Sequence, residues 1–290
     1  MFDIFLYPVS AVLWFWHTLF GAILTPDSGL AWVLAIFFLV FTVRVLLIRP
    51  ALSQLRAARR IRRLAPRMKK IRERYRDDRQ RMATEIQKLH ADAGTTPLAG
   101  CLPALLQLPV FLSLYWVLRD FEPGAQANHA FDRDGVVSFL NADLFGAKLG
   151  NWINQPMADL AAFGTDRAHM IAVGVPLMLI AGLATFLSMR LSMRRQDNPN
   201  PQLAGISKVM MYLAPAGMLL SGFLFPVPIG VLLYFLANNA WTFGQQHFLT
   251  IHVDREEART KPQKTVAAPR PGQKPRRRQG LVERRGREHR

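Results

Sequence analysis

The sequence has one cysteine, Cys101, and only 20 acidic residues against 37 lysines and arginines in 290 residues. One cysteine excludes a disulfide framework, and without a second cysteine or clustered histidines no spacing is typical of a zinc site. The formal net charge of +17 accompanies a mean hydropathy of +0.10. Because a uniformly basic chain would not also be hydropathic, charged and apolar residues must occupy different stretches.

Five stretches are apolar and about 20 residues long, which is the length that a helix needs to cross a bilayer. None of these apolar stretches, at 30–48, 98–118, 170–189, 207–225 and 228–248, contains Asp or Glu. We therefore predict an all-α polytopic membrane protein with a five-helix transmembrane core. The predicted segments are spans at 30–48, 96–121, 170–189, 207–225 and 228–248, an N-terminal helix at 1–29, a cytoplasmic basic helical hairpin at 49–95, an extracytoplasmic loop at 122–169, a cytoplasmic loop at 190–206 and a tail at 249–290.

The stretch from Ile4 to Leu24 is also apolar, and its few polar residues recur at helical spacing. These residues are Asp3, Ser10, His17, Thr18 and Gly21. A narrow polar stripe with nearby tryptophans favours a helix that lies in the membrane interface, and a sixth span is the alternative. The stretch lacks the basic start and the small-residue cleavage pattern of a signal peptide.

Charge between the spans predicts their orientation. Residues 49–93 carry 15 basic and 5 acidic residues, whereas residues 122–169 carry 3 and 6. Basic residues also dominate 190–208 and 249–290. Because basic loops stay on the cytoplasmic side, we expect a bacterial plasma membrane protein whose acidic loop is outside and whose C-terminus is cytoplasmic.

The basic segment after the first span is predicted to form two helices. Apolar residues at three-four spacing run through both halves, Asp77 and Asp78 can cap the second helix, and Gly94 ends it. His90 is expected at its surface. The hairpin would capture substrates or targeting partners, and the alternative is a solvated linker that only fixes topology.

The tail from about Asp254 is rich in arginine and proline and is predicted to be disordered. Its arginine clusters, Arg276–Arg278 and Arg284–Arg285, fit the phosphates of ribosomal RNA or the head groups of anionic lipids. No aromatic residue interleaves them, which argues against base-specific recognition. The alternative is a tail that only fixes topology and improves solubility.

Arg44, near the cytoplasmic end of the first span, is the most informative residue. An arginine in an apolar span is costly and by default marks a function, although its side chain can also reach the head groups. Polar side chains in the third and last predicted spans gather in the same half of the membrane, and Gln107 lies at mid-depth in the second. These polar residues are Gln107, Thr185, Ser188, Asn238, Asn239, Thr242 and Gln245. We predict a shared hydrated cavity, and the alternative is hydrogen bonding that only joins the helices.

Several motifs and contiguous segments together resemble the YidC-type membrane protein insertases. The segments are Thr95–Pro103, Gln107–Phe111, Phe225–Phe235, Asn238–Asn239 and Gln245–Gln246. An arginine in the first core span and a basic hairpin before the second add to the resemblance, which covers roughly residues 30–250 and lacks the large extracytoplasmic domain of some members.

The resemblance implies a groove that is open to the cytoplasm and to lipid, with Arg44 as its charge. It also implies substrate contacts at Phe235, beside Tyr234, and at Val40, although some relatives have tyrosine at the first of these positions and a hydroxyl residue at the last. The implied function is insertion and chaperoning of nascent membrane proteins without enzymatic chemistry or cofactors. Implied partners are nascent chains, the ribosome, the Sec translocon and the signal recognition particle machinery.

Two other classes of function are alternatives. A channel or transporter would also carry polar residues in its spans, but it predicts polarity through both membrane halves and a midplane site. A membrane-anchored RNA or ribosome tether needs only the hairpin and the tail, and it leaves Arg44 unexplained. The sequence contains no phosphate-binding loop, nucleophile elbow or His-Glu-x-x-His motif, which disfavours an enzyme.

Overall fold

The computed structural model describes residues 3–94, 102–195 and 201–260, and nearly all of its regular structure is helical. The helices are α1 (Asp3–Ile23), α2 (Gly29–Leu46), α3 (Ile48–Arg74), α4 (Arg79–Asp92), α5 (Leu102–Arg119), α6 (Arg133–Asn141), α7 (Met157–Ala162), α8 (Arg167–Arg195), α9 (Pro201–Leu224) and α10 (Ile229–Thr260). Strands β1 (Asp143–Leu144) and β2 (Ala147–Lys148) form a short antiparallel hairpin. The predicted all-α polytopic fold class is confirmed.

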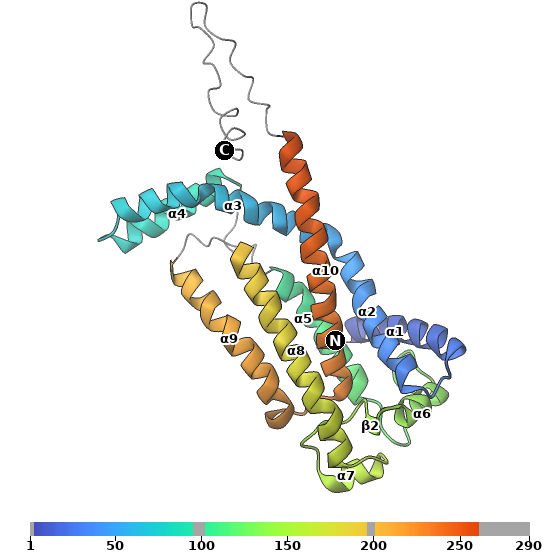
Figure 1. Cartoon of the computed structure of the whole chain (residues 1–290). Coiled ribbons are helices and arrows are strands. Elements are labelled where there is room, and N and C mark those ends of the chain that lie inside the picture. The colour runs from blue at the N-terminus through green and yellow to red at the C-terminus, as the bar shows by residue number, and fades with distance from the viewer. Residues whose placement is uncertain (1–2, 95–101, 196–200, 261–290) are drawn as a thin grey trace, which may run out of the picture. The chain divides into compact units, whose positions relative to one another are not determined.

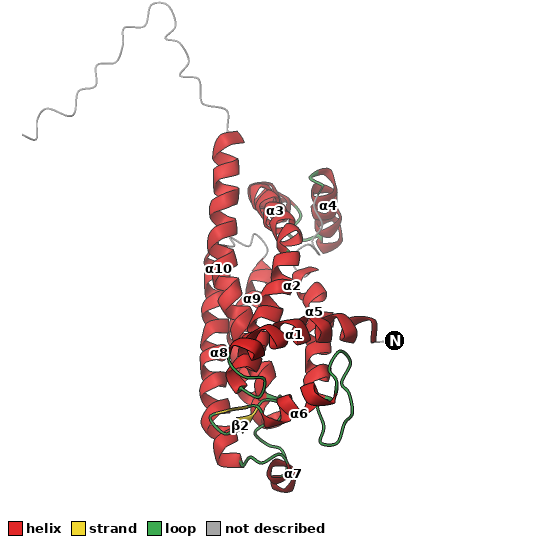
Figure 2. Ribbon diagram, turned by 90° about the vertical axis from the view of Figure 1, so that its right-hand side faces the viewer, coloured by secondary structure: helices red, strands yellow, loops and turns green. Residues whose placement is uncertain are grey.

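The described part of the chain divides into two units, one that ends at Thr250 and one that begins at Ile251. In the first unit α2, α5, α8, α9 and the start of α10 run alongside one another, whereas α1 lies across α2 (Figures 1 and 2). We call the end of this bundle near residues 120–167 the loop end, and the end near α3 and α4 the hairpin end. Under the predicted orientation, the loop end is outside.

Three helices in the described part of the chain are long and apolar enough to cross a membrane, by length and composition alone. They cover Ile4–Ile23, Gly29–Leu46 and Arg167–Met193, and a shorter apolar helix covers Lys208–Leu224. The predicted second span begins among residues 95–101, which include Cys101 and lie outside the described residues. Within its described part, α5 ends at Arg119, close to the predicted boundary at residue 121.

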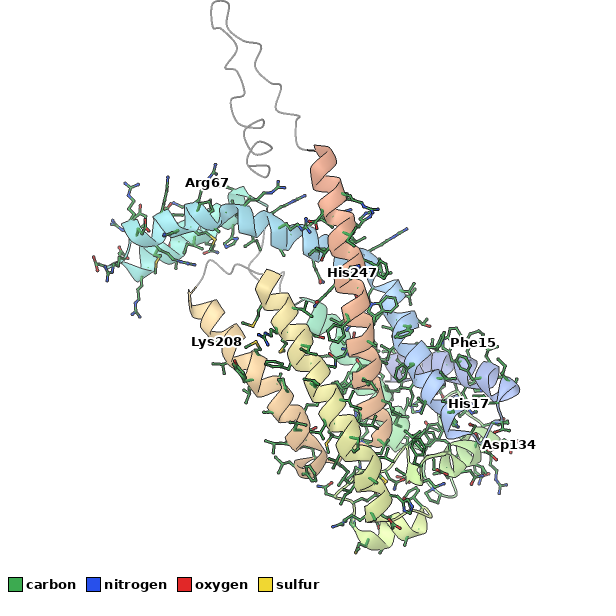
Figure 3. All side chains as sticks on the ribbon, in the orientation of Figure 1. Phe15, His17, Arg67, Asp134, Lys208 and His247 are labelled. Carbon is green, nitrogen blue, oxygen red and sulfur yellow. The ribbon has the colours of Figure 1, made fainter. Side chains whose placement is uncertain are left out.

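α1 turns Ser10, His17 and Gly21 of its polar stripe toward the protein, whereas Thr18 is exposed. Ser10 and His17 are buried, whereas the exposed face carries large apolar residues such as Phe15 (Figure 3). The Ser10 hydroxyl accepts a hydrogen bond from the Ala130 backbone N–H at 3.1 Å, and a His17 ring nitrogen lies 3.0 Å from the Pro26 carbonyl oxygen. The stripe therefore joins α1 to its neighbours, and the outward face is suited to lipid.

The loop of residues 122–169 is largely structured, which its composition did not predict. Asp132 caps α6 by accepting the Gly135 backbone N–H at 2.9 Å. Phe139 of α6 then packs on Trp32 of α2, with ring centroids 4.9 Å apart, and on Phe121 at 4.1 Å. This aromatic cluster fixes the loop on α2.

α3 and α4 form a helical hairpin, and Asp78 is the N-cap of α4, with its Oδ1 2.9 Å from the Arg81 nitrogen. The prediction that His90 is exposed was wrong: its side chain is only 7% exposed, and Met68 of α3 is buried as well. A histidine in the apolar seam of an amphipathic helix is covered by the facing helix, which charge counting does not reveal.

The last helix extends beyond the point where the sequence predicted the tail to begin. α10 continues to Thr260, whereas the predicted tail starts at residue 249. Its final turns contain good helix formers, and His252 and Glu256, which lie one turn apart, are within 3.2 Å. Residues 261–290, which include the arginine clusters, lie outside the described residues.

Candidate functional site

Arg44 lies in the last turn of α2 and points to α10. Its guanidinium donates two hydrogen bonds to Asn238 Oδ1, one from Nε at 3.2 Å and one from a terminal nitrogen. An amide oxygen is neutral, so it accepts these hydrogen bonds without neutralising the guanidinium charge. A carboxylate would neutralise it. The half-buried Arg44 therefore has a neutral hydrogen-bond partner within the bundle.

Gln107 of α5 reaches the same helix from another side. Its side-chain amide donates a hydrogen bond to the Tyr234 hydroxyl. One turn along α5, the Phe111 ring lies 5.7 Å from the Tyr234 ring and 5.4 Å from the Phe235 ring. Sequence reasoning missed Phe111, although its i+4 spacing from Gln107 places both residues on one face.

Asn239 makes the contacts to α8. Its side-chain nitrogen donates to Thr185 Oγ1 at 3.0 Å and to the Phe235 carbonyl oxygen at 3.0 Å, and its oxygen accepts from Ser188 Oγ at 3.2 Å. Asn239 and Ser188 are both buried. Because successive residues on a helix point about 100° apart, the adjacent Asn238 and Asn239 bind opposite neighbours. Figure 1 shows α10 running between α2 and α8.

The remaining predicted site residues lie nearby but make local contacts. Thr242 donates to the carbonyl oxygen of Asn238 at 2.7 Å, and Gln245 accepts from Trp241 Nε1 at 2.6 Å. Val40 and Tyr234 are each only 2% exposed, and Phe235 is half-buried. Val40 and Tyr234 thus lie inside the bundle in this conformation, so any contact with a substrate requires the helices to separate.

Polar residues of α10 and its neighbours thus form three separate contacts. They join α10 to α2, to α5 and to α8. A cavity of about 270 Å³ lies instead at the loop end, where Arg119, Lys148, Trp152 and Asp159 contribute to its lining. The hydrated groove at Arg44 stays a prediction. In the described part of the chain, no group of three or more His, Cys, Asp or Glu residues is placed to hold a metal ion.

Comparison with known proteins decides the family. The sequence profile of the family described as "60Kd inner membrane protein" matches residues 23–256. The chain is 41% identical over 298 aligned residues to the membrane protein insertase YidC of Mycobacterium tuberculosis H37Rv, which covers 95% of the chain and 81% of that relative. The chain belongs to the YidC family of membrane protein insertases. The resemblance read from its motifs is confirmed.

Other YidC relatives are similar over most of the chain. The insertase of Mycolicibacterium paratuberculosis is 40% identical, with 95% of this chain and 84% of that protein aligned. That of Corynebacterium glutamicum is 32% identical, with 88% and 65% aligned. Together with the apolar helices, these relatives support a multi-pass bacterial membrane protein with insertase function.

Proposed function

We propose that this YidC-family chain inserts nascent membrane proteins, and chaperones their folding, through a hydrated groove that opens to the cytoplasm beside α10. The observation that carries this proposal is the pairing of Arg44 with the neutral amide of Asn238. Among the described residues, no carboxylate forms an ion pair with Arg44, so its positive charge can attract an acidic flank of a client protein. This attraction is stronger in a partly dry site than in bulk water.

Substrate entry would separate α2 from α10. The polar flank of the client would replace Asn238 as the partner of Arg44, and the opening would expose Val40, Tyr234 and Phe235 to the apolar segment. That segment would then move along α2 and α10 into lipid. Transfer of about 20 apolar residues into the bilayer supplies the free energy, so the step needs neither a nucleotide nor a catalytic group.

The hairpin end would receive clients. With their excess of basic residues, α3 and α4 suit acidic targeting partners, and we assign the signal recognition particle machinery and the Sec translocon to this surface. The basic segment 261–290 would bind ribosomal RNA phosphates or anionic lipids. This assignment requires a cytoplasmic C-terminus, as the charge distribution predicts.

The groove is tested by insertion into proteoliposomes of two clients that differ only in an acidic or a neutral translocated flank. We expect Arg44→Ala to slow insertion of the acidic client about tenfold or more, because a hydrogen bond to a charged group contributes about 1.5–3 kcal/mol. Arg44→Lys should retain part of the activity. The matched control is Arg49→Ala, which removes an exposed arginine five positions along the chain. If Arg44→Ala inserts each of the two clients at the wild-type rate, the groove role is excluded.

A truncation after Thr260 tests the tail separately from the groove. We expect weaker binding to ribosomes in a sedimentation assay and nearly unchanged insertion of a client that is released from the ribosome. A membrane-anchored tether would instead lose all of its activity with the tail. Crosslinking from positions 44 and 235 to a stalled nascent chain distinguishes these outcomes directly.

A further inference from the structure

The tip of the β1–β2 hairpin presents an aromatic side chain in a strained turn. Phe145 and Gly146 connect the two strands with φ of 54° and 84°, as in type I′ turns. Asn, Asp or Gly favour the first of these positions, whereas a bulky residue there is strained. Phe145 is nevertheless 84% exposed, so no packing inside the protein compensates for this strain.

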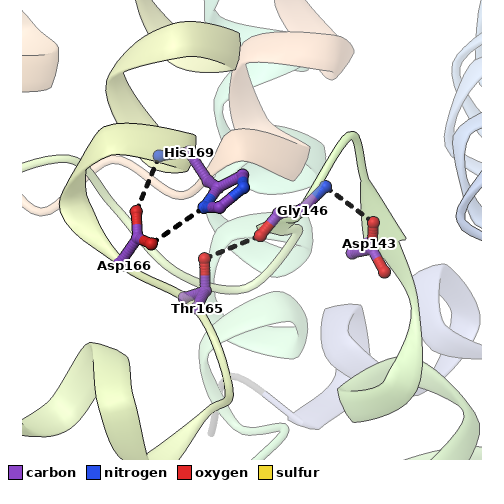
Figure 4. Close-up of polar contacts among 5 residues, drawn as sticks. All are labelled: Asp143, Gly146, Thr165, Asp166 and His169. Carbon is purple, nitrogen blue, oxygen red and sulfur yellow. Dashed lines mark hydrogen bonds and ion pairs between the residues drawn. The ribbon is translucent and has the colours of Figure 1, made fainter.

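The hairpin tip is fixed in place by polar contacts on both sides (Figure 4). Asp143 Oδ1 accepts the Gly146 backbone N–H at 2.8 Å, and the Gly146 carbonyl oxygen accepts the Thr165 hydroxyl at 2.7 Å. A Cβ atom on Gly146 would lie 2.4 Å from the ring of His169, so glycine is required there. The exposed ring of Phe145 is therefore carried on a rigid support.

The support lies at the level where two apolar helices begin. Gly29, the first residue of α2, approaches the Asp143 carbonyl so closely that a Cβ atom would lie 1.7 Å from its oxygen. On the other side, His169 is followed by Met170 and by Ile171, whose apolar side chain is 42% exposed. Exposed apolar surface thus starts within a turn of the residues that hold the hairpin tip.

We propose that Phe145 inserts into the membrane interface at the loop end and anchors the β-hairpin to the lipid surface. Aromatic residues are favoured at the boundary between head groups and acyl chains. The lipid would supply the contacts that the protein does not, which accounts for a bulky residue at a strained position. The anchor would fix the outer ends of α2 and α8 relative to the bilayer, and it does not depend on the groove at Arg44.

Spin labels on single cysteines test the position of the hairpin tip. Cys101→Ser removes the native cysteine, and Phe145→Cys, Ile171→Cys and Met157→Cys are then labelled in the full chain in phosphatidylcholine and phosphatidylglycerol vesicles. Met157 is the matched control, because it is a 68% exposed apolar residue of α7, also at the loop end. The measured quantity is the ratio of the collision rate with oxygen to that with a nickel chelate. We expect this ratio to be several-fold higher at position 145 than at position 157 and to approach the value at position 171. An equal ratio at positions 145 and 157 overturns the proposal. It does so whether Phe145 is in water or covered by another protein.

Hydrogen exchange separates an anchor from a turn residue. Phe145→Asn places a residue that favours positive φ at the tip, so the isolated turn becomes more stable. If lipid anchors the hairpin, amide exchange in residues 143–149 of Phe145→Asn becomes faster than in wild type in vesicles. If Phe145 has no lipid contact, exchange is unchanged or slower, and the proposal fails. Phe145→Trp should keep the wild-type exchange rate.

Discussion

The two ends of the bundle are joined by different kinds of contact. At the loop end, backbone meets backbone: the Ile229 and Gly230 N–H groups at the start of α10 donate to the Asn151 and Leu149 carbonyl oxygens at 3.0 and 2.8 Å. An aromatic cluster around the fully buried Trp32 adds to these contacts. Toward the hairpin end, α10 meets α2 and α8 mainly through the side chains of Asn238 and Asn239, with one aromatic contact between Trp241 and Phe41 of α2, whose ring centroids are 5.4 Å apart.

The difference indicates which end can open. Separating aromatic rings and backbone hydrogen bonds exposes apolar surface and leaves polar groups unpaired, so the loop end resists opening. Side-chain hydrogen bonds exchange for water or for polar groups of a client at little net cost. A bundle with these two ends should open at the hairpin end, and four substitutions test this comparison.

The largest effect is expected at Trp32. Trp32→Ala removes the centre of the aromatic cluster and leaves the Ser138 hydroxyl without its 3.2 Å contact to the indole N–H. We expect the variant to lose about 3–5 kcal/mol of stability, measured by thermal or denaturant unfolding in detergent. Trp14→Ala, at a 44% exposed position on α1, is the control and should lose much less. Similar losses for the two variants would mean that the loop end is not specially stabilised.

A smaller effect is expected at Gly29. Gly29→Ala forces α2 away from the Asp143 carbonyl, and overpacking of this kind costs about 1–3 kcal/mol. Gly217→Ala is matched to it, because a Cβ atom at Gly217 of α9 meets nothing within 4 Å. Unfolding of both variants should show a loss at position 29 and none at position 217. A loss of equal size at both positions would point to helix flexibility instead of packing.

Toward the hairpin end, Asn239→Ala should lower the free energy of unfolding by only about 1 kcal/mol. The hydroxyls of Thr185 and Ser188 lose their partner, but each can turn to a carbonyl of its own helix. A double-mutant cycle with Ser188→Ala isolates the contact, and the two losses should not add. A loss in Asn239→Ala as large as that in Trp32→Ala would contradict the proposed difference between the two ends.

The smallest effect concerns pH at the start of α8. Asp166 accepts the His169 backbone N–H at 2.9 Å, and this hydrogen bond lowers the pKa of its carboxyl below the usual 3.8. A lowered pKa in the folded state contributes stability that is complete above the unfolded pKa and is lost as pH falls through the folded one. Between about pH 6 and about pH 3, the melting temperature should fall slightly less in Asp166→Asn than in wild type, because asparagine caps the helix at either pH.

Asp159→Asn on α7 is the control for this pH dependence. It removes another acidic residue of the same loop that does not cap α8. If both variants change the pH dependence equally, the effect reflects the general charge of the loop and not the cap.

The long apolar helix α2, with Arg44 in its last turn, was predictable from the sequence. Membrane spans need about 20 apolar residues whatever their neighbours are, and Arg44 stands near the end of such a run. The order of the motifs also identified the family. The structure of the loop was harder to predict from the sequence. α6 and the β-hairpin are too short for a periodic pattern, and they gain their stability from packing on α2.

Periodicity also gave incomplete information about the directions of polar groups. It placed Ser10 and His17 on one stripe of α1, but only the neighbouring Ala130 and Pro26 show that this stripe faces protein. Likewise, it grouped Asn238 and Asn239 on one polar side of α10, although they bind different helices.

The amino-acid sequence by itself determined an all-helical membrane protein of the YidC family with one arginine at the end of its first long apolar helix. Only the tertiary structure decided that this arginine pairs with Asn238, that Asn239 binds α8, and that the loop end is joined through backbone and aromatic contacts. The physical reason is that a helical period relates each side chain to its own axis. The rotation of that axis, and hence the partner of each side chain, is set by the packing of all the helices together.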